Sequence, residues 1–256
     1  MSRLCAGIGY RARLTRVAEA TVSGDGHEPL AEKDASLLMK DLQREAGTGR
    51  YYTNLAAAFV RGRLETVAGT SDELIARGLA AGLRLHKFKR DSELPRVRTV
   101  IGAIRGMTPA SLLDCGSGRG TFLWPLMAAL PSLPVTAVDS NPQRVADIDA
   151  VRKGGVPNLG AVRADVCALP FANQTFEVVT ALEVLEHLER PGLAVREAIR
   201  VTRRFVIVSV PSKPDDNPEH VNVFDNGDLE QLLTEAGARR VRFDSVLNHR
   251  IAVASL

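Results

Sequence analysis

The chain has few cysteines and no long hydrophobic run, and these absences exclude several classes of protein. Its 256 residues include three cysteines, Cys5, Cys115 and Cys167, without a repeated spacing. An odd, unpatterned set predicts neither a disulfide framework nor a zinc knuckle, so the cytoplasm is the expected location. No apolar run approaches the length of a membrane span, and the start lacks the apolar core of a secretion signal. An organelle-targeting signal is the alternative for this arginine-rich, serine-poor start.

Charge is distributed unevenly along a chain whose composition is that of a globular protein. Hydrophobic residues make up 45% and charged residues 25%, and the formal net charge is +3. Residues 1–110 carry 18 Lys and Arg against 12 Asp and Glu, whereas residues 111–256 carry 15 against 18. The basic excess is interpreted either as a solvated helical surface or as a face for an anionic substrate or nucleic acid. The segment His86–Arg90 is the expected place for such a partner.

The hydrophobic periodicity divides the chain into two parts, 1–93 and 94–256. In the first part, apolar residues recur at helical spacing and predict helices at about 30–46, 51–67 and 71–85. The second part begins with one more helix and then alternates strands with helices. We therefore expect an N-terminal helical extension followed by one larger domain.

The alternation after residue 110 predicts a parallel sheet with right-handed crossovers. The last two strands are too close together for an intervening helix, so they are expected to form an antiparallel hairpin. The expected fold is α/β: a doubly wound, mostly parallel seven-stranded sheet that ends in an antiparallel hairpin. The expected strands are 111–115, 134–138, 159–163, 177–181, 204–210, 241–245 and 251–255, and the expected helices are 121–130, 141–153, 192–201 and 226–237.

The stretch from Asp114 to Gly120 carries the strongest functional signal. A short apolar strand ends in Asp114, and Gly116, Gly118 and Gly120 follow at alternate positions. Glycines allow the backbone to approach a ligand closely, and ligands of doubly wound sheets bind at the carboxyl ends of the strands. A dinucleotide site has its third glycine one residue later, where this chain has Thr121. Dinucleotide binding is the alternative, and an increase in the protein's thermal stability on addition of NAD would indicate it.

This spacing resembles motif I of the class I S-adenosylmethionine-dependent methyltransferases. Within that class, residues 94–256 resemble the ubiquinone-type, methyltransferase-11-like family. The resemblance implies S-adenosylmethionine as the cofactor, with Asp114 near its amino-acid end and the three glycines beside it. It also implies that residues 1–93 form a lid over the crevice and select the substrate.

The ends of the second and third expected strands supply further cofactor-binding candidates. Asp139, followed by Ser140, suits the two hydroxyl donors of a ribose, and the alternative is a helix cap. Asp165 and Val166 begin an Asp-x-x-x-Leu-Pro-Phe pattern similar to the adenine-binding segment of small-molecule methyltransferases. The resemblance implies that Asp165 accepts a hydrogen bond from the adenine amine and that Val166 donates its N–H to a ring nitrogen. The alternative is a turn acid before a buried Leu-Pro-Phe.

The fourth expected strand leads into the sequence Glu-Val-Leu-Glu-His at residues 183–187, which resembles a segment beside the methyl donor in this family. Glu183 is thus a candidate for cofactor binding and catalysis. His187 is a candidate general base, or a residue that only shapes the pocket. The polar, proline-rich loop 211–224 is expected to line the acceptor pocket through His220 and Asn222.

The same segment also resembles the metal-ligand segment of the Hen1-type RNA 3′-terminal 2′-O-methyltransferases. That resemblance implies Mg²⁺ or Mn²⁺ held by Glu183, Glu186 and His187, with His220 as a fourth ligand. The same string is usual in metal-free methyltransferases, and the later paired-histidine pattern of the RNA enzymes is not evident. The favoured interpretation therefore contains no metal.

We expect methyl transfer from S-adenosylmethionine to a hydroxyl or amine of a small molecule, with no membrane partner. One alternative is a metal-assisted RNA methyltransferase that binds RNA through the basic N-terminal region. The other is a catalytically silent S-adenosylmethionine-binding protein, because a fold can be retained after its catalytic activity is lost.

Overall fold

The structure is a computed structural model that describes residues 49–256 apart from residues 67, 89–93 and 215. The helix expected at 30–46 and the basic residues Lys89 and Arg90 lie outside the described residues. Among the described helices, none combines the length and the hydrophobicity of a transmembrane span. The elements follow one another as α2 (Gly49–Leu64), α3 (Ser71–Ala80), α4 (Pro95–Met107), β1 (Leu112–Cys115), α5 (Leu123–Ala129), β2 (Val135–Asp139), α6 (Pro142–Lys153), β3 (Leu159–Arg163), β4 (Phe176–Leu182), the 3₁₀ turn η1 (Leu185–His187), α7 (Pro191–Val201), β5 (Thr202–Pro211), α8 (Asn226–Glu235), β6 (Arg240–Val246) and β7 (His249–Ser255).

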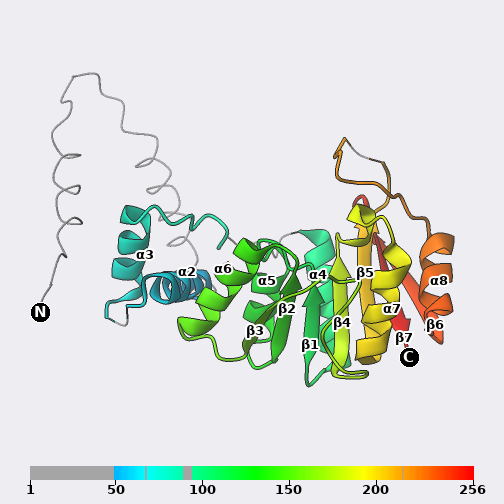
Figure 1. Cartoon of the computed structure of the whole chain (residues 1–256), viewed down its shortest axis with the longest axis horizontal. Helices are drawn as coiled ribbons and strands as arrows, with labels where there is room; N and C mark the ends of the chain where they lie inside the picture. The colour runs from blue at the N-terminus through cyan, green and yellow to red at the C-terminus, as the bar shows by residue number, and fades with distance from the viewer. Residues whose placement is uncertain (1–48, 67, 89–93, 215) are drawn as a thin grey trace, which may run out of the picture. The chain divides into compact units, whose positions relative to one another are not determined.

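The seven strands form one sheet in the order β3-β2-β1-β4-β5-β7-β6, as Figure 1 shows. Strands β1 to β5 pair in parallel, whereas β7 is antiparallel to both of its neighbours, β5 and β6. This confirms the predicted doubly wound sheet with a terminal hairpin. The carboxyl ends of the five parallel strands therefore lie along one edge, above which the loop after β5 rises (Figure 1).

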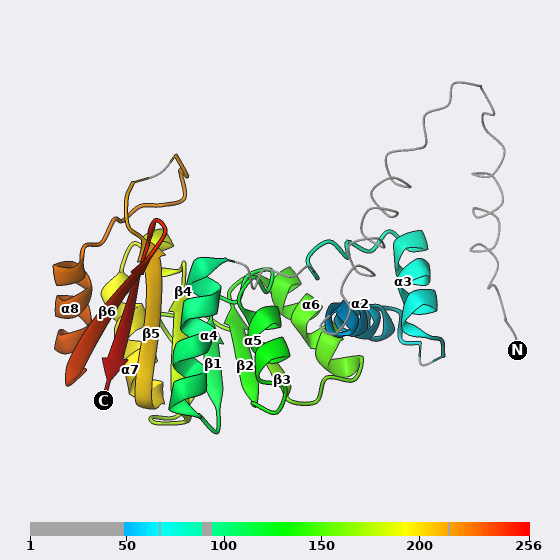
Figure 2. The same cartoon turned by 180° about the vertical axis from the view of Figure 1, so that it is seen from behind.

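Successive residues of each central strand face opposite sides of the sheet, so two helical layers cover it. Leu112 of β1 packs in one hydrophobic cluster with residues of α4, α5 and α6, and Leu113 packs in the other with residues of α7 and α8. Helices α7 and α8 lie in front of the sheet in Figure 1, and α4 and α5 lie in front of it in Figure 2. The near-continuous apolar strands follow from burial on both faces.

Helix α2 packs tightly against α6. A side chain at Gly62 would meet the backbone of Ala150, and one at Gly154 would meet the backbone of Ala58, so both glycines permit the close approach. Phe59 of α2 is buried in the same cluster as the sheet residues on that side. Residues of the predicted N-terminal extension thus share a core with the larger domain, and the boundary at residue 93 stays a prediction.

Candidate active site

A cavity of about 660 Å³ opens at the carboxyl ends of β1, β2 and β4. This volume is typical of a small-molecule site. We call it the glycine-loop cavity, because residues 116–122 between β1 and α5 form one of its walls. Of the residues predicted for the site, Gly120, Glu186, His220 and Asn222 do not line it. Those that do are Asp114, Gly116, Gly118, Asp139, Ser140, Asp165, Val166, Glu183 and His187.

Asp114 brings a buried carboxylate to the wall of this cavity. Its side chain is 2% exposed, and its Oδ1 accepts a hydrogen bond from Thr180 Oγ1 at 2.8 Å. Its Oδ2 is buried and has no hydrogen-bond partner among the described residues. Burial raises the pKa of Asp114 to about 6, although the nearby hydroxyl groups of Ser117 and Thr180 oppose the rise. An orphaned carboxylate oxygen at a cavity wall calls for a donor or cation from a ligand.

The glycine loop is longer than the sequence predicted, because α5 begins at Leu123 rather than near Thr121. Gly120 has a φ of +87°, and a side chain there would overlap the indole of Trp124. Trp124 Nε1 donates to the main-chain oxygen of Arg119 at 3.0 Å and so ties the loop to the start of the helix. Gly120 therefore makes room for Trp124, whereas Gly118 reaches the cavity.

Asp139, the last residue of β2, holds the glycine loop from the opposite side. Its Oδ2 accepts from Gly118 N at 2.9 Å and its Oδ1 accepts from Asn141 N at 2.9 Å. Arg144 Nη1 lies 3.5 Å from Oδ2. The cap of α6 is Asn141 rather than Asp139, because the Asn141 side chain accepts from the first free N–H groups of the helix. Asp139 is thus placed by the loop, with lone pairs still available to the cavity.

The segment that begins with Asp165 is clamped by Arg200 of α7. Asp165 Oδ1 accepts from Cys167 N at 2.8 Å, which closes a local turn. The guanidinium of Arg200 donates to the main-chain oxygens of Leu169 at 3.0 Å and Phe171 at 2.7 Å. The turn and the clamp hold Asp165 and its neighbour Val166 against the cavity.

Glu183 follows β4 in a left-handed conformation with a φ of +58°, which is unusual for a residue with a side chain. Its carboxylate accepts from Ser209 Oγ of β5 at 2.5 Å and lies 3.1 Å from His249 Nε2 of β7. Arg96 Nε of α4 lies 4.0 Å away. His249 Nδ1 is 2.9 Å from the carbonyl oxygen of Leu247, which can only accept, so that nitrogen carries a proton. Nε2 is the ring nitrogen that faces the Glu183 carboxylate.

His187 lies on the turn η1 and faces the cavity. Its Nδ1 is 3.0 Å from the carbonyl oxygen of Glu219 and must donate to it, which leaves the lone pair of the neutral ring on Nε2. The loop after β5 is held by Asn222, whose side-chain amide donates to the main-chain oxygen of Leu188 at 2.6 Å. Asn222 thus anchors the loop and does not line the cavity, while Glu219 does.

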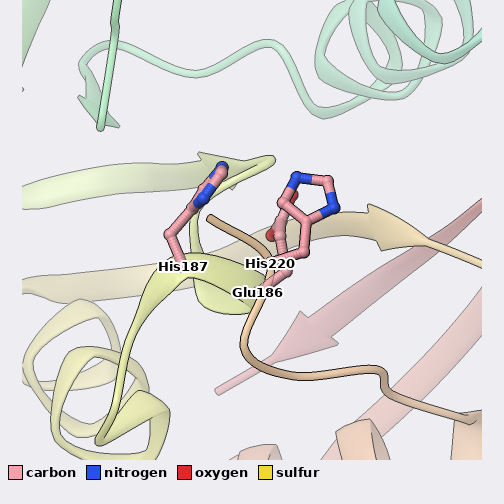
Figure 3. Close-up of side chains that lie close together, drawn as sticks. All are labelled: Glu186, His187 and His220. Carbon is pink, nitrogen blue, oxygen red and sulfur yellow. The ribbon is translucent and has the colours of Figure 1, made fainter. Parts of the chain in front are cut away.

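Three of the four residues named as possible metal ligands lie together, as Figure 3 shows. Single side-chain atoms of Glu186, His187 and His220 lie within 4.8 Å of one another. The rings of His187 and His220 meet edge to face, with their centres 4.7 Å apart. Glu183 is outside the group, because it precedes η1 and its carboxylate is bound by Ser209 and His249.

The sheet order and the sequence around the cavity are similar to those of the class I S-adenosylmethionine-dependent methyltransferases. Residues 113–208 match the family described as "Methyltransferase domain". The cofactor of this class is S-adenosylmethionine, and the orphaned Asp114 oxygen fits its ammonium group. The acid-rich wall fits a ligand that carries two positive charges and one negative charge.

Relatives of known name are also methyltransferases. Malonyl-acyl-carrier-protein O-methyltransferase of Methylococcus capsulatus is 27% identical over 154 residues, which cover 55% of this chain and 56% of that protein. Demethylmenaquinone methyltransferase of Renibacterium salmoninarum is 31% identical over 106 residues, 41% of this chain and 42% of that one. The chain spans about half the length of these relatives. The methyltransferase domain of a bacterial Hen1 shares the fold, with a TM-score of 0.51 at 19% identity over 63% of this chain and 96% of that one.

Proposed function

We propose that the protein transfers the methyl group of S-adenosylmethionine to a hydroxyl or amine of a small molecule. The observation that carries the proposal is the buried, unpartnered Oδ2 of Asp114 at the wall of the glycine-loop cavity. A buried carboxylate oxygen without a donor is costly, and an ammonium group of the cofactor would supply the missing partner. The names of the two relatives contain malonyl-acyl-carrier protein and demethylmenaquinone, and neither substrate is RNA.

In this proposal the remaining cavity residues bind the rest of the cofactor. Asp139 and Ser140 receive the ribose hydroxyls, and Asp165 with the N–H of Val166 receives the adenine, as the sequence predicted. S-adenosylmethionine supplies an electrophilic methyl group on a sulfonium. Glu183, fixed by Ser209 and His249, adds negative charge at the cavity wall beside that cation.

His187 is the proposed general base. Its Nδ1–H is committed to the Glu219 carbonyl, so Nε2 is the nitrogen that accepts the proton of the acceptor hydroxyl or amine. His220 packs against the ring of His187 and is proposed to keep it oriented. The protein's further contribution is alignment of the reactants, because the donor is intrinsically reactive.

His187→Gln tests the base, because glutamine preserves bulk and polarity but accepts no proton near neutral pH. We expect kcat to fall by about 10²–10⁴, the usual contribution of a general base. The affinity for S-adenosylhomocysteine, measured by calorimetry, should be unchanged. A variant that keeps wild-type kcat on an acceptor found by panel screening would exclude His187 as the base.

A metal-assisted reaction on RNA ends is the second candidate, favoured by the convergence of Glu186, His187 and His220. The two candidate functions require different roles of His187 that exclude each other, because its Nε2 can either accept a proton or bind a cation. We expect activity on a hydroxylated small molecule to be unaffected by EDTA, and to be lowered but not abolished by His220→Asn, because asparagine cannot pack against the His187 ring as His220 does. Activity on RNA ends that needs Mn²⁺ and disappears in His220→Asn would replace the first candidate by the second.

A silent binding protein would bind S-adenosylhomocysteine yet methylate nothing in either assay. Loss of binding in Asp114→Ala together with turnover in the wild type would exclude that possibility. We propose the cytoplasm as the location, because Cys115 and Cys167, the cysteines in the described part, are free.

A further inference from the structure

A second cavity of about 520 Å³ adjoins the glycine-loop cavity. The two share Gly118, Arg119 and Arg144 as lining residues. The other walls come from α2, from α6 and from residues 82–87 after α3. The segment of residues 82–87 runs from α3 towards α6 in both views (Figure 1, Figure 2). We call this second cavity the basic cavity.

The two cavities have opposite charge. Five carboxylates and three arginines line the glycine-loop cavity, whereas Asp147 is the one acid among the described residues that line the basic cavity. S-adenosylmethionine has a net positive charge and therefore suits the first cavity and not the second. The cationic side chains that line the basic cavity are Arg63, Arg84, Lys87, Arg119 and Arg144.

Lys87 lines the basic cavity with a largely buried side chain. Its side chain is 12% exposed, with Nζ 2.5 Å from Asp147 Oδ2 and 4.1 Å from the ring centre of Phe59. Burial lowers the pKa of Lys87, and the nearby cations Arg63 and Arg119 lower it further, against the effect of Asp147. The cations around this cavity therefore act on one another as well as on the acid.

Ordinary ion pairing does not account for this arrangement. Further along α6, Arg152 and Lys153 both pair with Asp149, at 2.7 and 3.0 Å, so each of these cations has a carboxylate partner on the helix surface. In the basic cavity, Asp147 already binds Lys87 and also accepts from Gln143 Nε2 at 3.1 Å. The positive charge of the lining arginines therefore exceeds the negative charge that the described lining supplies.

We propose that the basic cavity binds a phosphate-class oxyanion, free or carried by an organic molecule, through Arg63, Arg84 and Arg119. Guanidinium groups present paired N–H donors that match phosphate oxygens. The bound anion would offset the mutual repulsion of the cations. This inference does not depend on the proposed function, because the anion would bind whether or not a methyl group is transferred.

Calorimetric titration of the full chain with inorganic pyrophosphate tests the site, with NaCl holding the ionic strength constant and low. Arg63→Gln and Arg84→Gln should each weaken binding about tenfold, the loss expected for one charge-assisted hydrogen bond. Both residues are exposed, so their replacement should not disturb the fold. Arg98→Gln is the matched control, because Arg98 is exposed on α4 and lines neither cavity.

The affinity for S-adenosylhomocysteine should be the same in all three variants, which separates failure of the basic cavity from failure of the glycine-loop cavity. Phenyl phosphate binding more tightly than inorganic phosphate would identify a phosphate group carried by an organic molecule, and the reverse order would identify a free anion. Either order supports the site. The proposal is overturned if pyrophosphate does not bind at low ionic strength, if Arg98→Gln weakens it as much as Arg63→Gln, or if S-adenosylhomocysteine displaces it while Arg63→Gln binds normally.

Discussion

Replacing Asp114 by asparagine distinguishes two effects of this carboxylate: the free energy that its burial costs the folded protein, and its contribution to cofactor binding. Burial raises the pKa of Asp114 from its ordinary 3.8 to about 6. The folded state therefore disfavours the ionised form, and the contribution of Asp114 to stability is greatest below pH 4 and is lost as the pH rises through 6. At about 1.4 kcal/mol per pH unit, the loss amounts to about 3 kcal/mol.

Asp114→Asn keeps the shape and the hydrogen bond from Thr180 but cannot ionise. We expect its free energy of unfolding to match that of the wild type near pH 4 and to exceed it by up to about 3 kcal/mol at pH 8. Urea denaturation of the ligand-free protein at both values measures the difference. A variant that is less stable than the wild type at pH 8 would contradict the assigned cost of burial.

Cofactor binding should depend on pH in the opposite sense. If the ammonium group of S-adenosylmethionine binds only the ionised carboxylate, affinity should fall about tenfold between pH 7 and pH 5, since only about a tenth of a group with a pKa near 6 is ionised at pH 5. Asp114→Asn should bind about 10- to 100-fold more weakly at pH 8, with the pH dependence gone. 5′-Methylthioadenosine, which lacks the amino-acid part, is the ligand control and should show no such dependence. A flat wild-type profile, or equal profiles for both ligands, would refute the contact.

Two further substitutions test the supports of the site. Gly120→Ala should lower the free energy of unfolding by about 3 kcal/mol in urea, because the methyl group would overlap Trp124 at a φ of +87°. Its control, Gly102→Ala, lies in α4 with open space around it and should stabilise the protein by up to about 1 kcal/mol. Arg200→Lys should lower stability by about 1–3 kcal/mol and raise the Kd for S-adenosylhomocysteine, because lysine cannot form the fork of bonds that clamps the segment after Asp165. Unchanged binding in Arg200→Lys would show that the clamp does not position that segment.

The fold and the common location of the candidate residues could be predicted because both follow from local patterns. Alternating strands and helices imply a parallel sheet, and the carboxyl ends of parallel strands meet at one edge. That rule brings Asp114, Asp139, Asp165 and Glu183 to one cavity, although they are far apart in the sequence.

Other contacts depend on packing that no local pattern encodes. His249 reaches Glu183 because β7 lies beside β5, with His249 paired to Pro211 in the register. Arg96 reaches the cavity because α4 packs on the face of the sheet beside it. The candidate metal ligands Glu183, Glu186 and His187 do not all converge, because only residues 185–187 form a turn and Glu183 lies before it in a left-handed conformation.

The position of β7 in the sheet has a consequence for the folding of the chain during synthesis. Strand β7 is made after β6, yet it is inserted between β5 and β6. During synthesis, β5 therefore presents an unpaired edge until residues 249–255 emerge, and β6 has no strand to join. The same residues bring His249 to Glu183, so the Glu183 carboxylate gains this partner only when β7 has been made. A nascent or truncated chain that stops after β6 would contain every residue of the glycine loop, yet it would be prone to aggregate and would lack the contact of His249 with Glu183.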